Sequence, residues 1–288
     1  MPEARHEVVV ITGASAGIGR AAVQQFARRG ARIALIARDT ERLETARAEA
    51  ERLGAPEDFR RVTDVTYHGF VWGTMAALKR MRARDRGTIV QVSSALAYRS
   101  IPLQSPYCGA KHAIKGFTQS VRTELEHERS NIHIAVVDMP GVNTPQFEWC
   151  KTTLTHHPKP IGTVFQPEVA ARAIWWAAHA RRAEICVGAP TLSTVLAEKF
   201  VPRLLDLYLA RKGVSGQQGP QPIPADRPDN LWHPVPGPYA AHGTFDEGAS
   251  TRSLQLWATT HRTWLLAGVG AAAGLTGLAL GLRQQRRH

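Results

Sequence analysis

The sequence predicts an α/β fold built on a doubly wound parallel sheet. Apolar runs of strand length alternate with amphipathic helical segments from the start of the chain. A strand over 7–12, rich in Val and Ile, precedes a helix over 20–29, a strand over 32–37 and a charged helix over 40–53. This order is typical of a parallel sheet whose faces are covered by helices.

The alternation then breaks. Apolar periodicity over 56–81, starting at a proline, predicts a long helix, so two helices follow each other with no strand between them. Strands are predicted over 88–93, 132–137 and 184–187, with helices around Tyr107, over 167–179 and over 191–212. We therefore expect a parallel sheet from which part of the usual alternation is missing.

Charge and cysteine content narrow the function classes. The net charge is +12, but the cations are spread over predicted helices without a basic run interleaved with aromatics, so no nucleic-acid partner is expected. Cys108, Cys150 and Cys186 lie far apart and match no metal-ligand spacing. Reduced thiols in a cytosolic compartment and no metal site are the expectation. The first apolar stretch, 8–11, is too short for a signal peptide.

Composition divides the chain into three parts. Residues 1–212 form the predicted globular domain. Residues 213–262 are rich in Pro, Gly, Gln and Asp, which predicts a linker, although Trp232 offers an aromatic that could contact the domain. Residues 263–288 form a predicted transmembrane helix with a basic tail.

The apolar run over 264–282 carries no charge and has about the ~20 residues that cross a bilayer. Arg residues flank it on both sides, and its glycines at 270, 274, 277 and 281 suit close helix packing. A buried or dimer-forming helix is the alternative. The transmembrane interpretation implies a membrane-associated protein, and we expect its globular domain in the cytoplasm. The orientation of the helix stays open, because the basic residues over 283–287 also favour the cytoplasmic side.

A glycine-rich turn separates the first predicted strand from its helix. Glycines permit a tight turn and close backbone approach, and the helix N-terminus presents free N–H groups to a pyrophosphate. The second strand is followed by Arg38, which favours the 2′-phosphate of NADP over the free ribose of NAD. The candidate cofactor-binding residues here are Thr12, Gly13, Ser15, Gly17, Ile18, Gly19 and Arg38.

Tyr107 and Lys111 stand four residues apart on a predicted helix, and Ser94 lies thirteen residues before Tyr107. Side chains at i and i+4 project from one helix face. An ammonium beside a phenol favours the phenolate, so we expect Lys111 to lower the pKa of Tyr107 and make it a general acid or base near neutral pH.

These motifs, together with Pro140-Gly141-Val142-Asn143-Thr144, resemble the short-chain dehydrogenase/reductase family over residues 7–210. The resemblance implies a Rossmann-like sheet and a catalytic trio. Tyr107 would be the proton donor or acceptor, and Ser94 would hydrogen-bond the substrate oxygen. Lys111 would bind the nicotinamide ribose, and Pro140, Gly141 and Thr144 would hold the nicotinamide. The implied activity interconverts an alcohol and a ketone or aldehyde, with lipophilic substrates and a homo-oligomer as options.

Two departures from the family pattern stand out. Thr66 occupies the place of an Asn that often completes a proton relay. A strand, a helix and a further strand, roughly 40–60 residues, are missing between 53 and 56, which removes two strands of the usual seven.

If the sheet closes over this gap, the Ser94 strand pairs with the first strand. Ser94, Tyr107 and Lys111 then shift by one strand spacing, ~4.8 Å, relative to the glycine-rich turn. Hydride transfer requires reacting atoms ~3–3.5 Å apart. If the sheet does not close, backbone groups stay unpaired. The alternative function is therefore a catalytically impaired nucleotide-binding or scaffold remnant tethered to a membrane.

Overall fold

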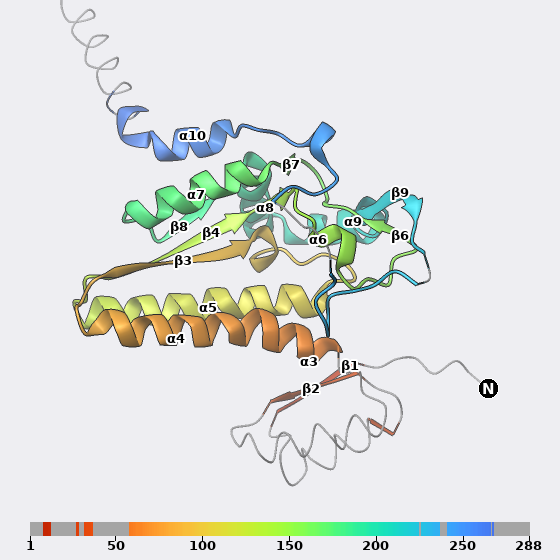
Figure 1. The fold of residues 1–288 in the computed structure, drawn as a ribbon, viewed down its shortest axis with the longest axis horizontal. Helices are drawn as coiled ribbons and strands as arrows, with labels where there is room; N and C mark the ends of the chain where they lie inside the picture. The colour runs from red at the N-terminus through yellow and green to blue at the C-terminus, as the bar shows by residue number, and fades with distance from the viewer. Residues whose placement is uncertain are drawn as a thin grey trace, which may run out of the picture. The chain divides into compact units, whose positions relative to one another are not determined.

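The computed structural model describes residues 8–12, 27–28, 32–36, 58–224, 226–236, 241–265 and 267 (Figure 1). The chain divides into two compact units, residues 1–61 and 62–288, and each is described by itself. In the first unit, β1 (Val8–Thr12) and β2 (Arg32–Ile36) form a parallel pair. Both strands agree with the predicted ones. The predicted helices over 20–29 and 40–53 lie outside the described residues, apart from 27–28.

The second unit is built on a three-stranded parallel sheet. Its strands are β3 (Gly87–Ser94), β4 (Ile132–Met139) and β8 (Glu184–Cys186), in the order β3-β4-β8. Among the described strands, β3 pairs only with β4, and β1 pairs only with β2. Each unit thus contains a parallel sheet, as the predicted α/β fold requires.

Helices cover both faces of this sheet (Figure 1). α3 (Asp58–Thr63), a π-helical turn over Asp64–His68 and α4 (Gly69–Arg82) follow one another, which confirms the predicted long helix. α4 and α5 (Ser105–His127) lie on one face, where Leu78, Val121 and Ile134 share a core. α7 (Pro167–His179) covers the other face and buries Val169, Ala173 and Ala177, four residues apart.

The predicted helix over 191–212 is two helices. α8 (Ala189–Phe200) ends at Val201, and α9 begins at Pro202 and runs to Lys212. Proline has no N–H to continue the first helix, but it suits the first turn of the second. Nine short elements complete the described unit: η2 (Ala95–Ala97), β5 (Gly141–Val142), α6 (Gln146–Trp149), β6 (His156–Pro158), β7 (Val164–Phe165), η3 (Ser215–Gln217), β9 (Gln218–Pro222), η4 (Asp246–Gly248) and α10 (Leu254–Thr260).

The described residues within 213–262, the predicted linker, include regular elements and specific hydrogen bonds. β9 pairs with β6, and the Arg227 guanidinium donates to the carbonyls of Phe147 and Cys150 at 3.0 and 2.9 Å. Residues 241–260, which we call the C-terminal strap, end in α10 (Figure 1), whose Leu256 joins the core under α7. Hydrogen bonds, which composition does not reveal, order much of this segment.

No helix among the described residues is both long and apolar enough to cross a membrane. The predicted transmembrane segment, 264–282, lies outside the described residues except at 264, 265 and 267. It stays a prediction.

Candidate active site

Ser94 and Tyr107 lie near each other at the carboxyl end of β3. Ser94 is the last residue of the strand, and its Oγ accepts the Leu96 N–H at 3.1 Å, which turns the chain into η2. Pro106 lies in the first turn of α5, where its missing N–H costs nothing, and Tyr107 follows it. The Ser94 side chain is near enough to Tyr107 to lower the pKa of its phenol. Two members of the predicted trio are thus neighbours.

Lys111 lies one turn further along α5 and is only 7% exposed. Its ammonium donates to the Val92 carbonyl at 3.1 Å and lies 4.8 Å from the centroid of the Phe70 ring. The same nitrogen lies 5.6 Å from the centroid of the Tyr107 ring. Burial lowers the pKa of Lys111 to about 8, while the charge of Asp138 acts in the opposite direction. Among the described residues, only Val92 accepts a hydrogen bond from this ammonium, so two N–H donors remain for a ligand.

The prediction that Lys111 lowers the pKa of Tyr107 is wrong for this structure. Burial raises the pKa of Tyr107 to about 12, and the nearby Ser94 side chain offsets only part of that rise. The ammonium is directed at the Val92 carbonyl and the Phe70 ring, so it does not hydrogen-bond the phenol oxygen. Tyr107 is therefore a neutral phenol at neutral pH and is able to act as an acid.

A second polar group lies behind the trio and was missed by sequence reasoning. The Tyr98 hydroxyl contacts Asp138 Oδ2 at 3.1 Å and also hydrogen-bonds the Glu184 carboxyl. Burial, followed by the charge of Glu184, raises the pKa of Asp138 to about 7. A phenol has one proton to donate, so a second hydrogen bond to these carboxyls requires a proton on one of them. Lys115 lies over the Tyr98 ring, 3.3 Å from its centroid.

Only the register of the strands could have predicted the polar group around Asp138. Asp138 on β4 is paired with Ser93 on β3 and with Cys186 on β8, so these three residues share one row of the sheet. They lie 45 or more positions apart in the sequence. Burial raises the pKa of the Cys186 thiol to about 12, with Asp138 adding to the rise, so it is held as a thiol.

The candidate cofactor residues are described only in part. Thr12 ends β1, while Gly13, Ser15, Gly17, Ile18, Gly19 and Arg38 lie outside the described residues. Pro140, Gly141 and Thr144 follow β4 directly, and Gly141 pairs with Val164 on β7. A Cβ on Gly141 would lie 2.6 Å from Pro160 Cβ, so a larger residue there would displace the neighbouring loop.

Asn143 joins this loop to the C-terminal strap. It is fully buried, and its amide donates to Gln166 Oε1 at 3.0 Å and to Asp246 Oδ1 at 2.8 Å. Its Oδ1 accepts the Phe245 N–H at 3.0 Å. Sequence reasoning treated Asn143 only as part of the resemblance and did not give it this role.

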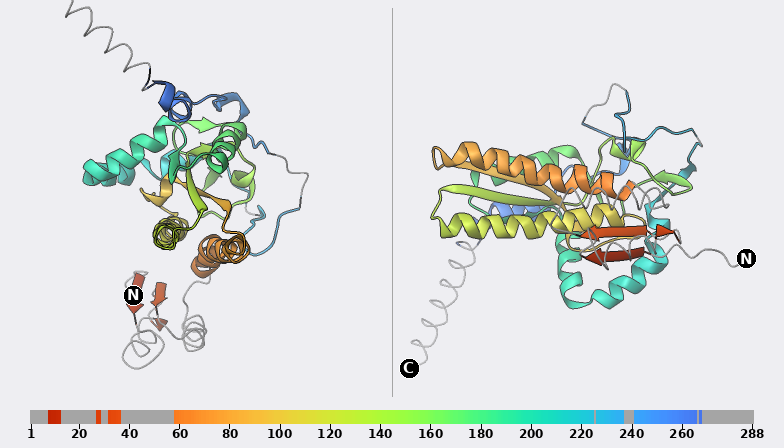
Figure 2. Two further views of the ribbon diagram at one scale, coloured as in Figure 1. Left: turned by 90° about the vertical axis from the view of Figure 1, so that its left-hand side faces the viewer. Right: turned by 90° about the horizontal axis from the view of Figure 1, so that it is seen from below.

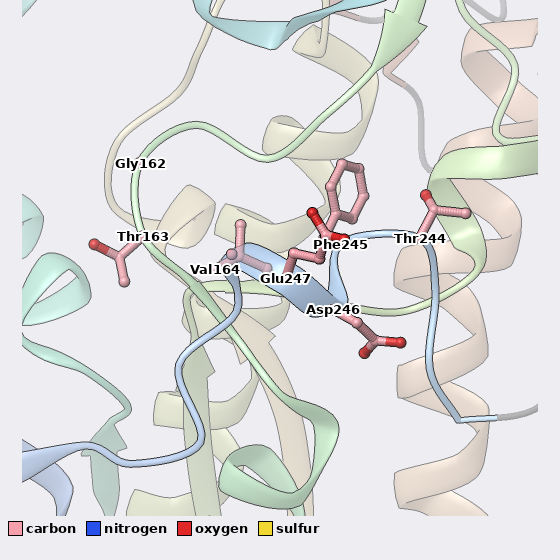
Figure 3. A pocket seen from close by; sticks show the side chains of 8 residues that line it. Gly162, Thr163, Val164, Thr244, Phe245, Asp246 and Glu247 are labelled. Carbon is pink, nitrogen blue, oxygen red and sulfur yellow. The ribbon is translucent and has the colours of Figure 1, made fainter.

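An open pocket lies beside the same strap. It is lined by residues 162–164 before α7 and by residues 244–248, with Phe245, Asp246 and Glu247 on one side (Figure 3). Ser94, Tyr107 and Lys111 do not line it. Thr66, which stands where the family often has an Asn, lies in the π-helical turn before α4, a type of turn frequent at functional sites.

Comparison with known proteins identifies the family. The model of the short chain dehydrogenase family matches residues 7–56 and 51–153, which together make up half of the chain. The chain belongs to the short-chain dehydrogenase family. Members of this family are NAD(P)-dependent oxidoreductases, so the chain is an oxidoreductase by family.

Individual relatives of this short-chain dehydrogenase are distant. The uncharacterized oxidoreductase YxnA of Bacillus subtilis (strain 168) is 26% identical over 276 residues, covering 78% of this chain and 76% of YxnA. The 11-beta-hydroxysteroid dehydrogenase 1A of Arabidopsis thaliana is 31% identical over 185 residues, covering 47% of this chain and 52% of that protein. A short chain dehydrogenase from Burkholderia cenocepacia J2315, solved in complex with NADP, is 20% identical with a TM-score of 0.42 and covers 72% of this chain and 98% of that one.

Proposed function

We propose that this chain is an NADP-dependent oxidoreductase that interconverts an alcohol and a ketone or aldehyde, with Tyr107 as the acid or base. The observation that carries the proposal is the nearness of Ser94, at the end of β3, to Tyr107 on α5, with a buried lysine one helical turn away. When bound, the nicotinamide would supply or accept the hydride. Tyr107 would give a proton to the carbonyl oxygen, or take one from the alcohol, while Ser94 hydrogen-bonds that oxygen.

The described half of the site fits the ribose end of such a cofactor. Lys111 has two N–H donors that no described residue uses, and ribose hydroxyls accept such bonds. The neutral state of Tyr107 supports carbonyl reduction at neutral pH, because a reduced carbonyl oxygen needs a proton. Arg38, which follows the second strand in the sequence, supports NADP over NAD. The glycine-rich turn supplies the residues that would hold the pyrophosphate. Both assignments come from the sequence alone.

A catalytically impaired remnant is the second candidate, and one observation favours it. The alignment with YxnA spans 276 positions, yet 78% of this chain is only about 225 residues, so about 50 positions of the relative have no counterpart here. This number is in the range expected for the segment missing after residue 53.

Cofactor binding and turnover separate the two candidates. NADPH affinity is measured by quenching of protein fluorescence, and turnover by loss of NADPH absorbance with a panel of ketones and aldehydes. For the enzyme, Tyr107→Phe should lower kcat by about 10²–10⁴-fold with NADPH affinity unchanged. Tyr208→Phe, an exposed tyrosine on α9, is the matched control. Absence of NADPH binding and turnover supports the remnant, and activity that survives Tyr107→Phe disproves the mechanism.

Attachment to a membrane through residues 264–282 is part of the same proposal. Its length and lack of charge support it. Carbonate extraction of membranes from cells that express the full chain is the test. Release of the protein into the supernatant would exclude a spanning helix.

A further inference from the structure

Helices α8 and α9 bury very little of their surface. α8 has 12 residues and buries only Thr191, and α9 has 11 residues and buries only Leu209. Helices of this length in a folded domain usually bury a continuous apolar stripe. Figure 2 shows the two helices, in teal and cyan, at one side of the second unit.

The apolar residues that are left exposed follow helical spacing. Phe200 is 73% exposed and Leu204 is 62% exposed, and they lie on either side of the turn at Val201. On α8 the exposed positions are four residues apart, and on α9 they are three or four residues apart, so each helix presents a stripe. The exposed residues are Leu192, Leu196, Phe200, Val201, Leu204, Leu207 and Tyr208. We call these residues and the cations beside them the α8–α9 surface.

Cations predominate on this surface. The two acidic residues of the helices, Glu198 and Asp206, are both held by the Arg99 guanidinium, which enters from beyond η2. The cations are not neutralised in this way. Lys199, Arg203, Arg211 and Lys212 are exposed, and none forms an ion pair with a residue in the described part of the chain.

We propose that the α8–α9 surface binds the face of an anionic lipid bilayer. Exposed Leu, Phe and Tyr side chains beside Lys and Arg are the combination that lies at a bilayer interface, with the apolar groups among the acyl chains and the cations at anionic headgroups. A second copy of the chain fits less well. A two-fold interface would place these cations on both sides, while Glu198 and Asp206, the acidic residues of the two helices, are already paired with Arg99. This inference concerns neither the trio nor the cofactor and stands apart from the proposed enzymatic function.

Vesicle binding of the full chain tests the charge component. The purified protein is sedimented with vesicles of pure phosphatidylcholine, or of phosphatidylcholine with about a third phosphatidylserine. The partition coefficient should be about tenfold or more higher on the phosphatidylserine vesicles. Lys199→Gln with Arg203→Gln should lower it about 25-fold, at about fivefold for each cation removed.

A second pair of variants tests the apolar component. Phe200→Ser with Leu204→Ser should weaken binding to the phosphatidylserine vesicles about tenfold or more. Both positions are exposed, so the folded chain should tolerate the change. Trp175→Ser on α7, which is similarly exposed, and Lys79→Gln on α4 are the matched controls and should change nothing.

Hydrogen exchange identifies the contact even if residues 264–282 also bind vesicles. Amides of residues 189–212 should exchange more slowly with phosphatidylserine vesicles, while those of α4 should not. The proposal is overturned if the chain binds both vesicle types equally, if the variants bind like the original chain, or if exchange over 189–212 is unchanged in the bound protein. It is also overturned if the surface instead drives a dimer that Phe200→Ser with Leu204→Ser dissolves, without vesicle binding.

Discussion

Leu254 and Leu256 of α10 provide a sharp test of how the C-terminal strap is held. They stand two positions apart on one short helix, so they share helix propensity and sequence context. Leu254 is 84% exposed, whereas Leu256 is 6% exposed and joins the core formed by β4, β8 and α7. Leu256→Ala therefore removes buried contacts, and Leu254→Ala removes almost none.

The magnitude follows from burial. Truncating a buried leucine to alanine costs about 2–5 kcal/mol, which combines the lost transfer free energy with the cavity left behind. α10 lies at the edge of the core and is able to shift, so we expect about 2–3 kcal/mol for Leu256→Ala, at the low end of that range. An exposed truncation such as Leu254→Ala should stay within about 0.5 kcal/mol.

Urea unfolding followed by tryptophan fluorescence measures both variants. At an m value of about 2 kcal/mol/M, the Leu256→Ala midpoint should fall by about 1 M, with that of Leu254→Ala unchanged. Amide exchange over residues 254–260 should also speed up in Leu256→Ala alone. Equal midpoints for the two variants would mean that α10 does not pack on this core, and the account of the strap would be wrong.

Three further predictions concern buried or strained positions. Asn143→Ala should lower the free energy of unfolding in urea by about 3 kcal/mol, because the Phe245 N–H loses its acceptor and two buried hydrogen bonds disappear. An unchanged urea midpoint would contradict the role given to Asn143. The folded-state pKa of Asp138, about 7, lies above its usual 3.8, so its contribution to stability is fully present below about pH 4 and is lost as pH rises to 7. Asp138→Asn should remove several kcal/mol of this pH dependence, measured by urea unfolding at a series of pH values. Identical pH profiles for the variant and the original chain would refute the assignment. Gly188→Ala should lower the melting temperature, because Gly188 has φ +81° and a Cβ would lie 2.8 Å from the Phe165 ring; an unshifted melt would contradict this geometry.

The sequence was sufficient where local pattern determines structure. Apolar spacing of three and four residues predicted the helix over 167–179 at its observed bounds, because that helix lies on one core face. The thirteen-residue spacing of Ser94 and Tyr107 predicted two residues that do lie near each other. Pro202 was the missed local signal, since a proline after twelve helical residues favours two helices over one.

The remainder depended on contacts between distant segments. Asp138 and Tyr98 come together only through strand register and the turn after β3, which the sequence does not encode locally. The pKa of Tyr107 was misjudged because the pattern showed a nearby cation but not the burial that outweighs it. The strap was missed because its order depends on hydrogen bonds to Asn143 and on the burial of Leu256 rather than on apolar content.

The distance along the chain between Asn143 and its partners has a consequence during synthesis. Asp246 lies 103 positions after Asn143. At ~5–20 residues per second, a ribosome needs on the order of 5–20 s to make that stretch. Until then the amide of Asn143 and the loop around it lack these partners and depend on water. A translation product that stops before the strap would therefore leave this loop open to chaperones and proteases, so completion of the site is tied to completion of the polypeptide.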